Sequence, residues 1–483
     1  MELKKLIDQI DYEEIIGELP YEINSVVDNS KKVQNGSLFI CVKGENVDAS
    51  KFIKEAVNNG CIVVVSQEKL GADICTVVVK DIKKATAQIA KAFYGNPQED
   101  LRIVGVVGTN GKTTICHVLS ALLTDGGYNV GVTGTIGSYY NGKTYPSALT
   151  TPSCLDLYKL IYEMAKSGVE ILVMEVSAHA IAQRRCEGLY FHSLIFTNCT
   201  EDHLDYFIDF ESYKNTKISI FDGKNSSYMV VNSDDDVGRE ILSVAKGKVI
   251  TYGINNPADV FAIDVEEKIT GIEYVINLFD VIYDIKCVLY GKVNVYNTLA
   301  CCAVAAMLGV SPDQIASSLK IIKPIEGRAQ PIAKTKGCLV FVDYAHTPDG
   351  LFQTLTSMKK ICKGKLYCVF GCGGNREKQK RSIMGKISGS IADFTVITSD
   401  NPRFEDECAI IRQIETGIKE VTYKYITIKD RKAAIRYALD KVCEDDLLVI
   451  AGKGAEEYQE VLGEKRYFSD KKEVLEYLEL TEA

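Results

Sequence analysis

Short apolar runs rich in β-branched residues recur from about residue 103 onward, and each ends in glycine, asparagine or an acidic residue. Runs of this kind are typical of buried strands. The segment between the first two, "TTICHVLSALLTDGG", has a helical pattern with a glycine stop. Strands that alternate with helices predict a mainly parallel sheet, whose ligands lie at the carboxyl ends of the strands. The runs are "IVGVVG", "YNVGVTG", "EILVMEV", "SLIFTN" and "SYMVVN".

A second series of runs begins after residue 330, and a smaller α/β pattern occupies the first 95 residues. Proline, glycine and charged residues cluster at 94–100 and 322–328, where we expect domain boundaries. We therefore predict an α/β fold with three domains, at residues 1–97, 98–325 and 326–483. The supporting runs are "GSLFICV" and "CIVVVS", then "CLVFVDYAHT", "KLYCVFGCGG", "DFTVITSDNPR" and "DLLVIAGKG".

The composition narrows the class of protein. A chain of 483 residues with 46% hydrophobic and 25% charged residues can bury a sizeable core. Its net charge of -9 argues against nucleic-acid binding as the main activity. We expect no membrane insertion and a cytoplasmic location, because no apolar run reaches spanning length and the N-terminus lacks a signal-type core. Sixteen cysteines in apolar segments, none in Cys-x-x-Cys spacing, predict reduced thiols and no zinc site.

The stretch "GVVGTNGKTT" joins a predicted strand to a predicted helix. Gly108 and Gly111 let backbone NH groups approach an anion at the positive end of the helix. Lys112 supplies a charge for the terminal phosphates of a nucleotide, and the Thr113 hydroxyl is placed for Mg²⁺. A Walker loop has glycine where this chain has Val106, so the sequence predicts a shortened phosphate loop. The alternative is a plain glycine turn with a surface lysine.

Acidic and histidine residues follow two predicted strands that we expect to be neighbours. Carboxylates at strand ends beside a phosphate loop are a common place for Mg²⁺ between protein and nucleotide. One such acid alone would be a helix cap or a solvated loop residue. The residues are Glu175, Ser177 and His179 after one strand, and Glu201, Asp202, His203 and Asp205 after the other.

The motifs taken together resemble the Mur ligase family, and within it the branch (MurE type) that joins meso-diaminopimelate to UDP-N-acetylmuramoyl-L-alanyl-D-glutamate. The resemblance implies a uridine-binding first domain, a central P-loop ATPase domain and a Rossmann-like third domain. It also implies an ATP-dependent amide ligase of peptidoglycan synthesis that forms an acyl phosphate, and we expect a monomer. The matching segments, in order, are "GTNGKTT", "LTTP", "MEVSAHAIAQRR", "NCTEDHLDYF", "YKNTK", "GKVNVYN", "GRAQ", "DYAHTPDGL", "GCGGNREKQKR", "SDNPR" and "GKGAEEYQ".

The resemblance also implies the catalytic and metal residues. Thr113 and Glu175 would bind one Mg²⁺, and His203 would lie near a second. Lys217 matches a lysine that the family carbamylates, which turns a cation into an anion able to face Mg²⁺. From the residues alone, Lys217 is an ordinary helix-surface lysine. Lys112 completes the catalytic set.

The nucleotide contacts would come from the loop and from three later residues, with His346 nearby. Asn297 could instead cap a helix, and Arg328 could instead form an interdomain salt bridge. The ATP set implied is Gly108, Thr109, Asn110, Gly111, Lys112, Thr113, Thr114, Asn297, Arg328 and Asp343.

Two substrate sites are implied in the same way. In the amino-acid site, Arg403 would pair with the distal carboxylate of diaminopimelate, and Glu456 would meet its distal ammonium. The UDP-sugar set is Ser30, Thr150, Thr151, Ser177, Gln183 and Arg185, and the amino-acid set is Arg376, Asp400, Asn401, Pro402, Arg403, Gly452 and Glu456.

Five departures from the family pattern leave the substrate open. They are "DNSKK", "VDAS" at 47–50, Ala178, Glu201 and Ala455. Lysine, another amino acid, or a different UDP-peptide used by a paralogue therefore remain alternatives. Two other classes are a regulatory P-loop NTPase and, from "GCGGNRE", a dinucleotide oxidoreductase, although the glycine spacing there differs from Gly-x-Gly-x-x-Gly.

Overall fold

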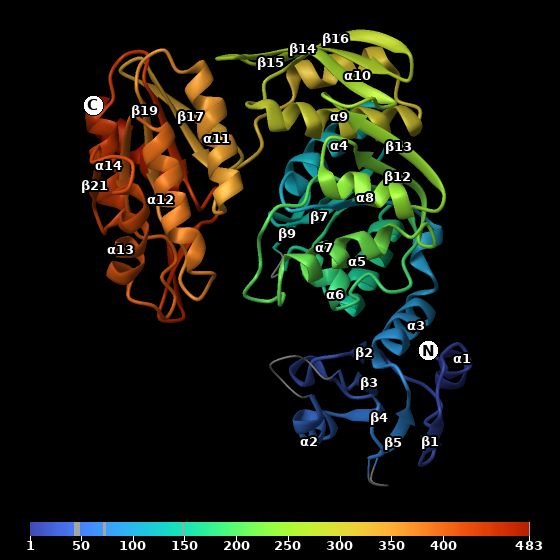
Figure 1. Cartoon of the computed structure of the whole chain (residues 1–483). Helices are drawn as coiled ribbons and strands as arrows, with labels where there is room; N and C mark the ends of the chain where they lie inside the picture. Colours follow the sequence, from blue (N-terminus) through green and yellow to red (C-terminus); the bar gives the residue numbers. More distant parts are fainter. Residues whose placement is uncertain (43–48, 71–73, 147–148, 483) are drawn as a thin grey trace. The chain divides into compact units, whose positions relative to one another are not determined.

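The computed structural model describes residues 1–42, 49–70, 74–146 and 149–482. The chain forms two compact units. The first unit comprises Met1–Val107, Gly127–Leu194 and Ile220–Tyr228, and the second comprises Gly108–Gly126, Ile195–Ser219 and Met229–Ala483. The principal sheets in the described part of the chain have five, eleven and six strands, and Figure 1 shows how their strands and helices follow one another. The predicted class, three α/β domains, is confirmed, and the boundaries after residues 97 and 325 stay a prediction.

The N-terminal sheet lies in the first unit. Its strand order is β1-β5-β4-β3-β2, and only the pairing of β1 with β5 is antiparallel. The helix that follows it, α3, is capped by the Asp81 side chain and ends at Gly95, whose φ of 72° is left-handed. The elements are α1 (Leu3–Ile7), β1 (Glu14–Ile16), β2 (Ser25–Val27), η1 (Ser30–Lys32), β3 (Ser37–Ile40), η2 (Ala49–Phe52), α2 (Ile53–Asn58), β4 (Cys61–Ser66), β5 (Cys75–Val78), α3 (Ile82–Tyr94) and η3 (Pro97–Glu99).

The central sheet has the order β16-β15-β14-β13-β12-β11-β6-β10-β7-β8-β9. Strand β10 pairs in parallel with β6 and β7, and all its side chains are buried. The strands before the two acidic clusters, β10 and β11, were predicted to be neighbours, and this was wrong: β6 lies between them in the sheet order. The strands are β6 (Arg102–Val107), β7 (Val130–Gly134), β8 (Gly137–Tyr140), β9 (Lys143–Tyr145), β10 (Ile171–Val176), β11 (Phe191–Phe196), β12 (Ser226–Asn232) and β13 (Lys248–Gly253).

The sequence reading missed an antiparallel meander that extends this sheet: β14 (Val260–Lys268), β15 (Gly271–Leu278) and β16 (Val281–Cys287). Phe279 and Asp280 form its second turn with φ of 51° and 67°, the positive values that a two-residue hairpin turn favours. The associated helices are α4 (Lys112–Asp125), α5 (Cys154–Lys166), α6 (Ala178–Ala182), α7 (Phe210–Ile218), η4 (Ser219–Phe221), α8 (Asp236–Val244), α9 (Lys292–Met307) and α10 (Pro312–Ile321).

The C-terminal sheet belongs to the second unit and has the order β17-β18-β22-β19-β20-β21. Only the pairing of β17 with β18 is antiparallel. The elements are β17 (Gln330–Thr335), β18 (Cys338–Asp343), α11 (Pro348–Ile361), β19 (Leu366–Phe370), α12 (Gln379–Ile391), β20 (Phe394–Ile397), α13 (Glu407–Ile418), β21 (Tyr425–Thr427), α14 (Arg431–Lys441), β22 (Leu447–Ala451), β23 (Tyr458–Val461), β24 (Glu464–Tyr467) and α15 (Asp470–Glu482).

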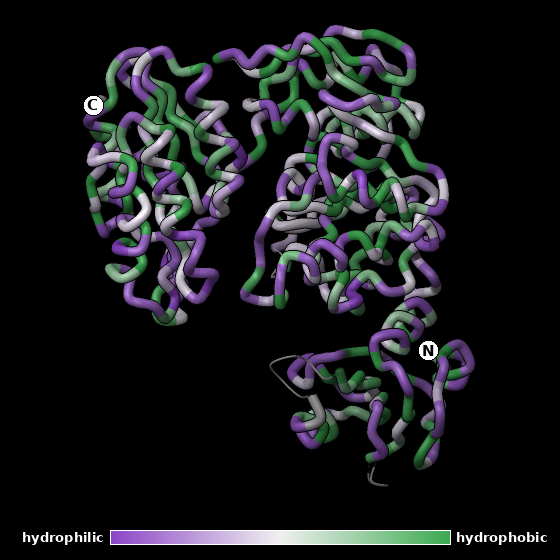
Figure 2. Tube along the Cα trace, in the orientation of Figure 1, coloured by the Kyte–Doolittle hydropathy of each residue, from purple (hydrophilic) through white to green (hydrophobic). Residues whose placement is uncertain are grey.

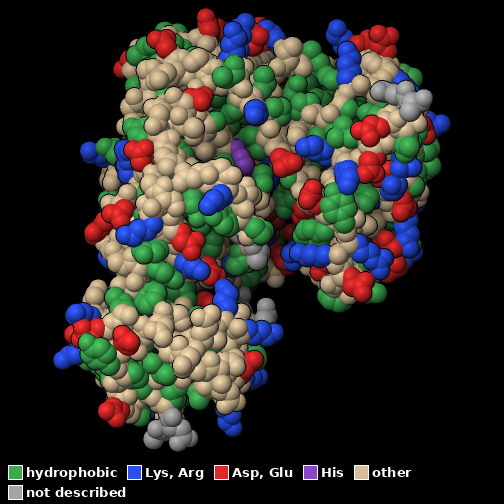
Figure 3. All heavy atoms as spheres, turned by 180° about the vertical axis from the view of Figure 1, so that it is seen from behind, with side chains coloured by type: hydrophobic (Ala, Val, Ile, Leu, Met, Phe, Trp, Pro, Cys, Tyr) green, Lys and Arg blue, Asp and Glu red, His purple; other side chains and the backbone are tan. Residues whose placement is uncertain are grey.

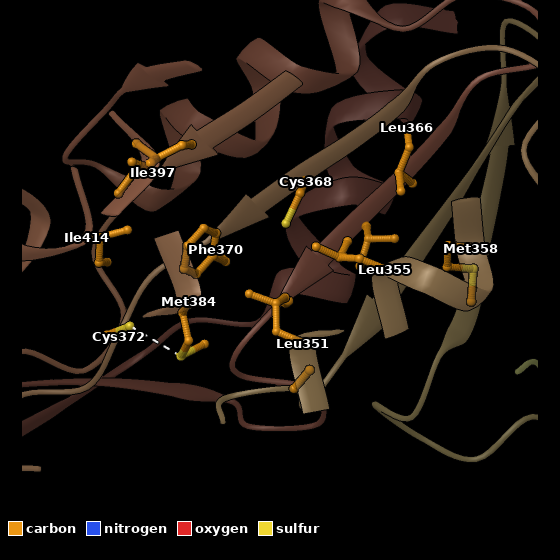
Figure 4. Packing of buried hydrophobic residues seen from close by; sticks show 14 of the residues in the cluster. Leu351, Leu355, Met358, Leu366, Cys368, Phe370, Cys372, Met384, Ile397 and Ile414 are labelled. Carbon is orange, nitrogen blue, oxygen red and sulfur yellow. Dashed lines mark hydrogen bonds between the residues drawn. The ribbon is translucent and has the colours of Figure 1, made fainter. Parts of the chain in front are cut away.

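Both faces of the C-terminal sheet are buried. Leu366, Cys368 and Phe370 alternate along β19 and face a core with side chains of α11 and α12, as Figure 4 shows. Tyr367 and Val369 face the opposite core, against α14 and α15. The hydrophobic colour accordingly runs along the strands of this sheet, while its connecting loops carry much of the hydrophilic colour (Figure 2). Because helices cover the faces, polar site residues belong at the strand ends.

The distribution of charged side chains and the burial of the cysteines are those expected of an α/β protein with apolar cores. Basic and acidic side chains are interspersed over the face that Figure 3 shows. The cysteines are free thiols, and most are buried in the apolar cores. None of the helices in the described part of the chain has the length and apolar character that crossing a bilayer requires.

Candidate active site

The predicted phosphate loop of the second unit is a tight glycine turn fixed by the chain after β11. The NH of Asn110 donates to the Asn198 side chain at 2.9 Å, and Thr197 donates to the Asn110 carbonyl at 2.6 Å. Gly108 and Gly111 have φ of 154° and 90°. A Cβ at Gly108 would lie 1.8 Å from the Thr197 hydroxyl oxygen, so only glycine fits there. The loop is therefore a rigid concave backbone at the N-terminus of α4.

Two cations border this loop. The Lys112 ammonium donates to the carbonyls of Gly108 and Thr109 at 2.8 and 2.9 Å. The Arg328 guanidinium donates to the Thr113 hydroxyl at 3.0 Å and stacks 4.3 Å above the Tyr344 ring. Charge of this sign at a helix N-terminus suits the phosphates of a nucleotide.

Lys217 projects from α7 into a closed pocket and is fully buried. Its amine donates to the Thr109 hydroxyl at 2.6 Å, lies 3.9 Å above the Tyr213 ring and is 3.7 Å from the Cys199 sulfur. Burial lowers the pKa of Lys217 to about 7, with Cys199 opposing the shift and Lys112 adding to it. The helix-surface alternative is therefore wrong, and Lys217 places a buried amine beside the phosphate loop.

An ionised acid lies close to this pocket. Burial opposes the charge of Asp202, but His203, His346 and Lys380 hold the pKa of its carboxyl below the usual value. The His203 Nε2 is 3.5 Å from an Asp202 oxygen, and its ring meets Tyr213 edge-on. Across the described ranges, no three His, Cys, Asp or Glu side chains converge on one metal position. The possible cation ligands at this position are the Asp202 carboxylate and the His203 imidazole.

A cavity of about 480 Å³ opens beside the loop within the second unit, and its walls come from the loop, from α9 and from the turn after β18. Asn297 lies in the second turn of α9, whose N-cap is Gly291, so the helix-cap alternative is wrong. Its amide donates to Asn294 at 2.8 Å, and its oxygen faces Gly111. Amide and tyrosine side chains lining a cavity of this size suit a nucleoside.

Asp234, which the sequence reading missed, forms one wall of this cavity. Its carboxylate accepts from the backbone NH groups of Ile254, Asn255 and Asn256 and from the Tyr296 hydroxyl at 2.8 Å. The strand-end rule could have found it, since Asp234 lies two residues after the end of β12.

Asp343, predicted to contact ATP, holds the turns around Arg328. Its carboxylate accepts from the NH groups of Ala329 and Ala345 at 2.6 and 2.9 Å and from the Thr354 hydroxyl at 3.1 Å. The turn that carries Arg328 is thereby tied to the end of β18. Arg328 itself bonds Thr113, and the interdomain salt bridge finds no counterpart among the described ion pairs. A direct contact of Asp343 with ATP stays a prediction.

In the first unit, Glu175 forms a polar network at the end of β10. It is 2% exposed, and its carboxylate accepts from the NH and the hydroxyl of Thr135 at 2.8 and 3.1 Å. Thr135 also bonds Thr150 at 3.2 Å, and Thr151 donates to the Glu175 carbonyl at 2.8 Å. Thr135 was missed, although it follows β7 as a hydroxyl at a strand end.

The same network includes most of the predicted UDP-sugar residues. Arg185 donates to the Thr151 carbonyl at 2.9 Å and to the Gln183 side chain at 3.0 Å, and the Ser177 NH donates to Thr151 at 3.1 Å. Ser30 is the first residue of η1 in the N-terminal segment, and its hydroxyl donates to Glu55 at 2.7 Å. The first two residues of "VDAS" lie outside the described residues.

The predicted amino-acid residues gather at strand ends of the C-terminal sheet. Gly452, just after β22, has φ of 114°, and a Cβ there would lie 2.6 Å from an Asp400 oxygen. Asn401 donates to Glu456 at 2.9 Å and accepts from Lys453 at 3.0 Å. The other residues of this set, Arg376, Pro402 and Arg403, lie in the two loops that follow β19 and β20.

A buried ion pair clamps these two loops together. Arg381, fully buried on α12, donates to both oxygens of Glu405 at 2.9 and 3.0 Å and to the Gly373 carbonyl at 3.1 Å. Glu405 also accepts from the Asn375 NH at 2.5 Å. The Gly374 NH bonds the Asn401 carbonyl at 2.8 Å. This pair could not be predicted from the sequence, because the segment "EKQKR" has the composition of a solvated charged surface.

Glu405→Gln is expected to lower the free energy of unfolding at pH 7 by about 3 kcal/mol. Hydrogen bonding to Arg381 lowers the pKa of Glu405 from 4.5 to about 2. Its stabilisation is therefore complete above pH 4.5 and lost as the pH falls from 4.5 toward 2. Denaturant unfolding at pH 7, 4.5 and 3 should show wild type and variant converging in acid. Glu420→Gln, at the exposed pair with Lys386, is the control and should change little; a constant gap at all three pH values would contradict the assignment.

The sequence of this chain matches those of known proteins over nearly its whole length. Family models match three successive segments: Mur ligase family, catalytic domain, at residues 22–94; Mur ligase middle domain at 106–305; and Mur ligase, glutamate ligase domain, at 327–454. The UDP-N-acetylmuramoyl-L-alanyl-D-glutamate--2,6-diaminopimelate ligase of Caldanaerobacter subterraneus is 38% identical over 465 residues, 96% of each chain. The ligase of the same name from Clostridium botulinum is 39% identical over 99% of each chain.

Solved structures share the fold of this chain. A UDP-N-acetylmuramoyl-L-alanyl-D-glutamate--2,6-diaminopimelate ligase superposes with a TM-score of 0.69 at 29% identity, over 95% of this chain and 96% of the other. The MurF ligase of Thermotoga maritima in complex with ADP shares the fold, with a TM-score of 0.65 at 22% identity over 94% and 97% of the two chains. The prediction of family and of enzyme class is confirmed. The chain belongs to the Mur ligase family, and it is an ATP-dependent amide ligase of peptidoglycan synthesis.

Proposed function

We propose that this ligase joins meso-diaminopimelate to UDP-N-acetylmuramoyl-L-alanyl-D-glutamate, with release of ADP and phosphate. The names of the relatives at 38% and 39% identity support this substrate pair. The observation that carries the proposal is the meeting of Arg403, Asn401 and Glu456 at the strand ends of the C-terminal sheet. A guanidinium and a carboxylate at one site offer a partner to each charge of an amino-acid terminus.

The phosphate loop supplies the activation step. Transfer of the last phosphoryl group of ATP to the glutamyl carboxylate needs in-line positioning and charge neutralisation. Lys112 and Arg328 provide positive charge at the loop, and the glycine backbone provides NH donors. The cavity bounded by Asn297 and Asp234 would hold the nucleoside. The amine of the incoming amino acid then attacks the acyl phosphate, and phosphate leaves as the amide forms.

Lys217 is proposed to act as a carbamate. A neutral amine adds CO₂ to give an N-carboxylate and a proton, and an amine whose pKa lies near 7 is substantially neutral at physiological pH. By the family resemblance, Thr113 and Glu175 would hold one Mg²⁺ and His203 would lie near a second, and the Lys217 carbamate would supply an oxygen anion able to face Mg²⁺. Bound Mg²⁺ would offset negative charge on the phosphates.

The first unit would bind the sugar nucleotide. The network of Thr150, Thr151, Ser177, Gln183 and Arg185 presents hydroxyls, amides and a guanidinium, which suit pyrophosphate and carboxylate oxygens. Ser30 of η1 would contact the uridine.

The test is an amino-acid panel with full-length protein, ATP, Mg²⁺ and UDP-N-acetylmuramoyl-dipeptide. Phosphate release and product mass are recorded for meso-diaminopimelate, L-lysine and L-ornithine. The expected result is a lengthened UDP-peptide with meso-diaminopimelate and little product with the other two. Product with lysine alone would replace the proposed substrate but keep the ligase chemistry. Phosphate release that ignores both the dipeptide and the amine would favour the regulatory NTPase.

A further inference from the structure

Glu460 lies against Arg403 at the amino-acid site. One of its carboxylate oxygens is 3.3 Å from the Arg403 Nε, and the two side chains are 21% and 20% exposed. The backbone fixes this pairing, because the Arg403 NH donates to the Glu460 carbonyl at 3.0 Å and Arg403 bridges to Val461 of β23. The guanidinium also donates to the Gly374 carbonyl at 2.8 Å. Glu460 is thus a built partner of Arg403 and not a surface acid that happens to be near it.

Asn401 connects Glu460 to a second acid. The Glu460 NH donates to the Asn401 side-chain oxygen at 3.0 Å, and the amide nitrogen of Asn401 donates to Glu456 at 2.9 Å. Burial raises the pKa of Tyr458, and the neighbouring Glu456 and Glu460 add to the shift while Arg403 opposes it. The ammonium groups of Lys453 and Lys465 lie 5.5 and 4.1 Å from the centre of the same ring.

Two ion pairs frame this site, beside the buried Asp400 carboxylate and beside Lys465, the cross-strand partner of Glu460. Glu456 is paired with the fully buried Lys453 at 3.3 Å, and Glu460 is paired with Arg403. A ligand end that carries both an ammonium and a carboxylate can meet an opposite charge at each position and adds no net charge to the site. An ammonium alone must share Glu460 with Arg403, and a carboxylate alone must compete with Glu460 for the guanidinium. Either mismatch leaves a half-buried charge poorly paired.

We propose that Glu460 is a specificity-determining residue that, together with Arg403, selects amino acids whose side chain ends in both an ammonium and a carboxylate. The inference rests on the proposed function, because it assumes that this site receives the incoming amino acid. It assigns recognition of the distal ammonium to Glu460 in addition to Glu456.

The experiment compares Glu460→Gln with wild type in the full-length ligase. Steady-state rates are measured with ATP, Mg²⁺, UDP-N-acetylmuramoyl-dipeptide and one of three amines: meso-diaminopimelate, L-2-aminopimelate (which lacks the distal ammonium) or L-lysine (which lacks the distal carboxylate). Loss of a charged hydrogen bond should raise KM for meso-diaminopimelate roughly tenfold, with kcat within about twofold. The preference for meso-diaminopimelate over L-2-aminopimelate should fall by a similar factor. Glu460→Asp should keep part of that preference.

The matched control is Glu457→Gln, because Glu457 lies nearby and is exposed. It should leave all three KM values unchanged. A loss of equal size with all three amines in Glu460→Gln would overturn the proposal, since Glu460 would then only hold Arg403 in place. Wild-type use of lysine in preference to meso-diaminopimelate would also overturn it while leaving the ligase function intact. Absence of a lengthened product with every amine would instead refute the proposed function itself. Thermal unfolding of each variant separates these outcomes from misfolding.

Discussion

Lys217→Ala is expected to lower kcat for amide formation by at least about 100-fold while the protein stays folded. The amine is fully buried 2.6 Å from the Thr109 hydroxyl of the phosphate loop, so its carbamate would place negative charge beside the nucleotide phosphates and their Mg²⁺. Alanine removes that charge and every oxygen it carries. The measurement is the rate of formation of the lengthened UDP-peptide, with phosphate release recorded in parallel.

Rescue distinguishes a carbamate from a structural lysine. A short carboxylic acid such as acetate or propionate can enter the space that Lys217→Ala leaves and restore an oxygen anion there. Activity that rises with the concentration of acid supports the carbamate, whereas a folded variant that no acid rescues would remove it. Lys214→Ala is the control on the same helix, since Lys214 pairs with Glu211 and Glu240 at the surface and should change kcat little.

The apolar pattern predicted the parallel strands well, because strands buried on both faces are continuous runs of β-branched residues. Strand β10, "ILVMEV", and strand β22, "LLVIA", follow this rule. The meander of β14 to β16 was missed, since its strands carry many exposed charged side chains and its second turn uses Phe279 and Asp280 in place of glycine. The order of the strands in the sheet could not be predicted either, because no local sequence pattern places β6 between β10 and β11.

Some features of the candidate site could likewise be predicted from the sequence, and others could not. The phosphate loop could be read directly, because Gly108 and Gly111 are required by backbone geometry that spacing reveals. The burial of Lys217 could not, because α7 is polar and only the tertiary fold brings Thr109 and Cys199 to the amine. Ion pairs such as Arg381 with Glu405 join residues more than twenty positions apart, and single-sequence patterns hold no information on such partners.

A second buried ion pair stabilises the strand ends that carry the amino-acid site. Arg431 donates to both oxygens of Asp470 at 2.7 Å, and both side chains are fully buried. The same guanidinium donates to the carbonyls of Ser399 and Ala451, which immediately precede Asp400 and Gly452. The pair therefore holds α14, α15 and two strand ends in one arrangement.

Asp470→Ala is expected to lower the free energy of unfolding by about 3–5 kcal/mol, because it leaves the Arg431 charge buried without its partner. Denaturant unfolding measures this loss, and KM for the amino acid should rise in the same variant as the ends of β20 and β22 loosen. Glu476→Ala, at an exposed pair with Lys472 on the same helix, should cost less than about 1 kcal/mol. The double variant Arg431→Met/Asp470→Leu should recover much of the stability, since apolar side chains of similar size can replace a buried pair. A single variant as stable as wild type, or a double variant as unstable as the single one, would show that the pair is not held as the structure has it.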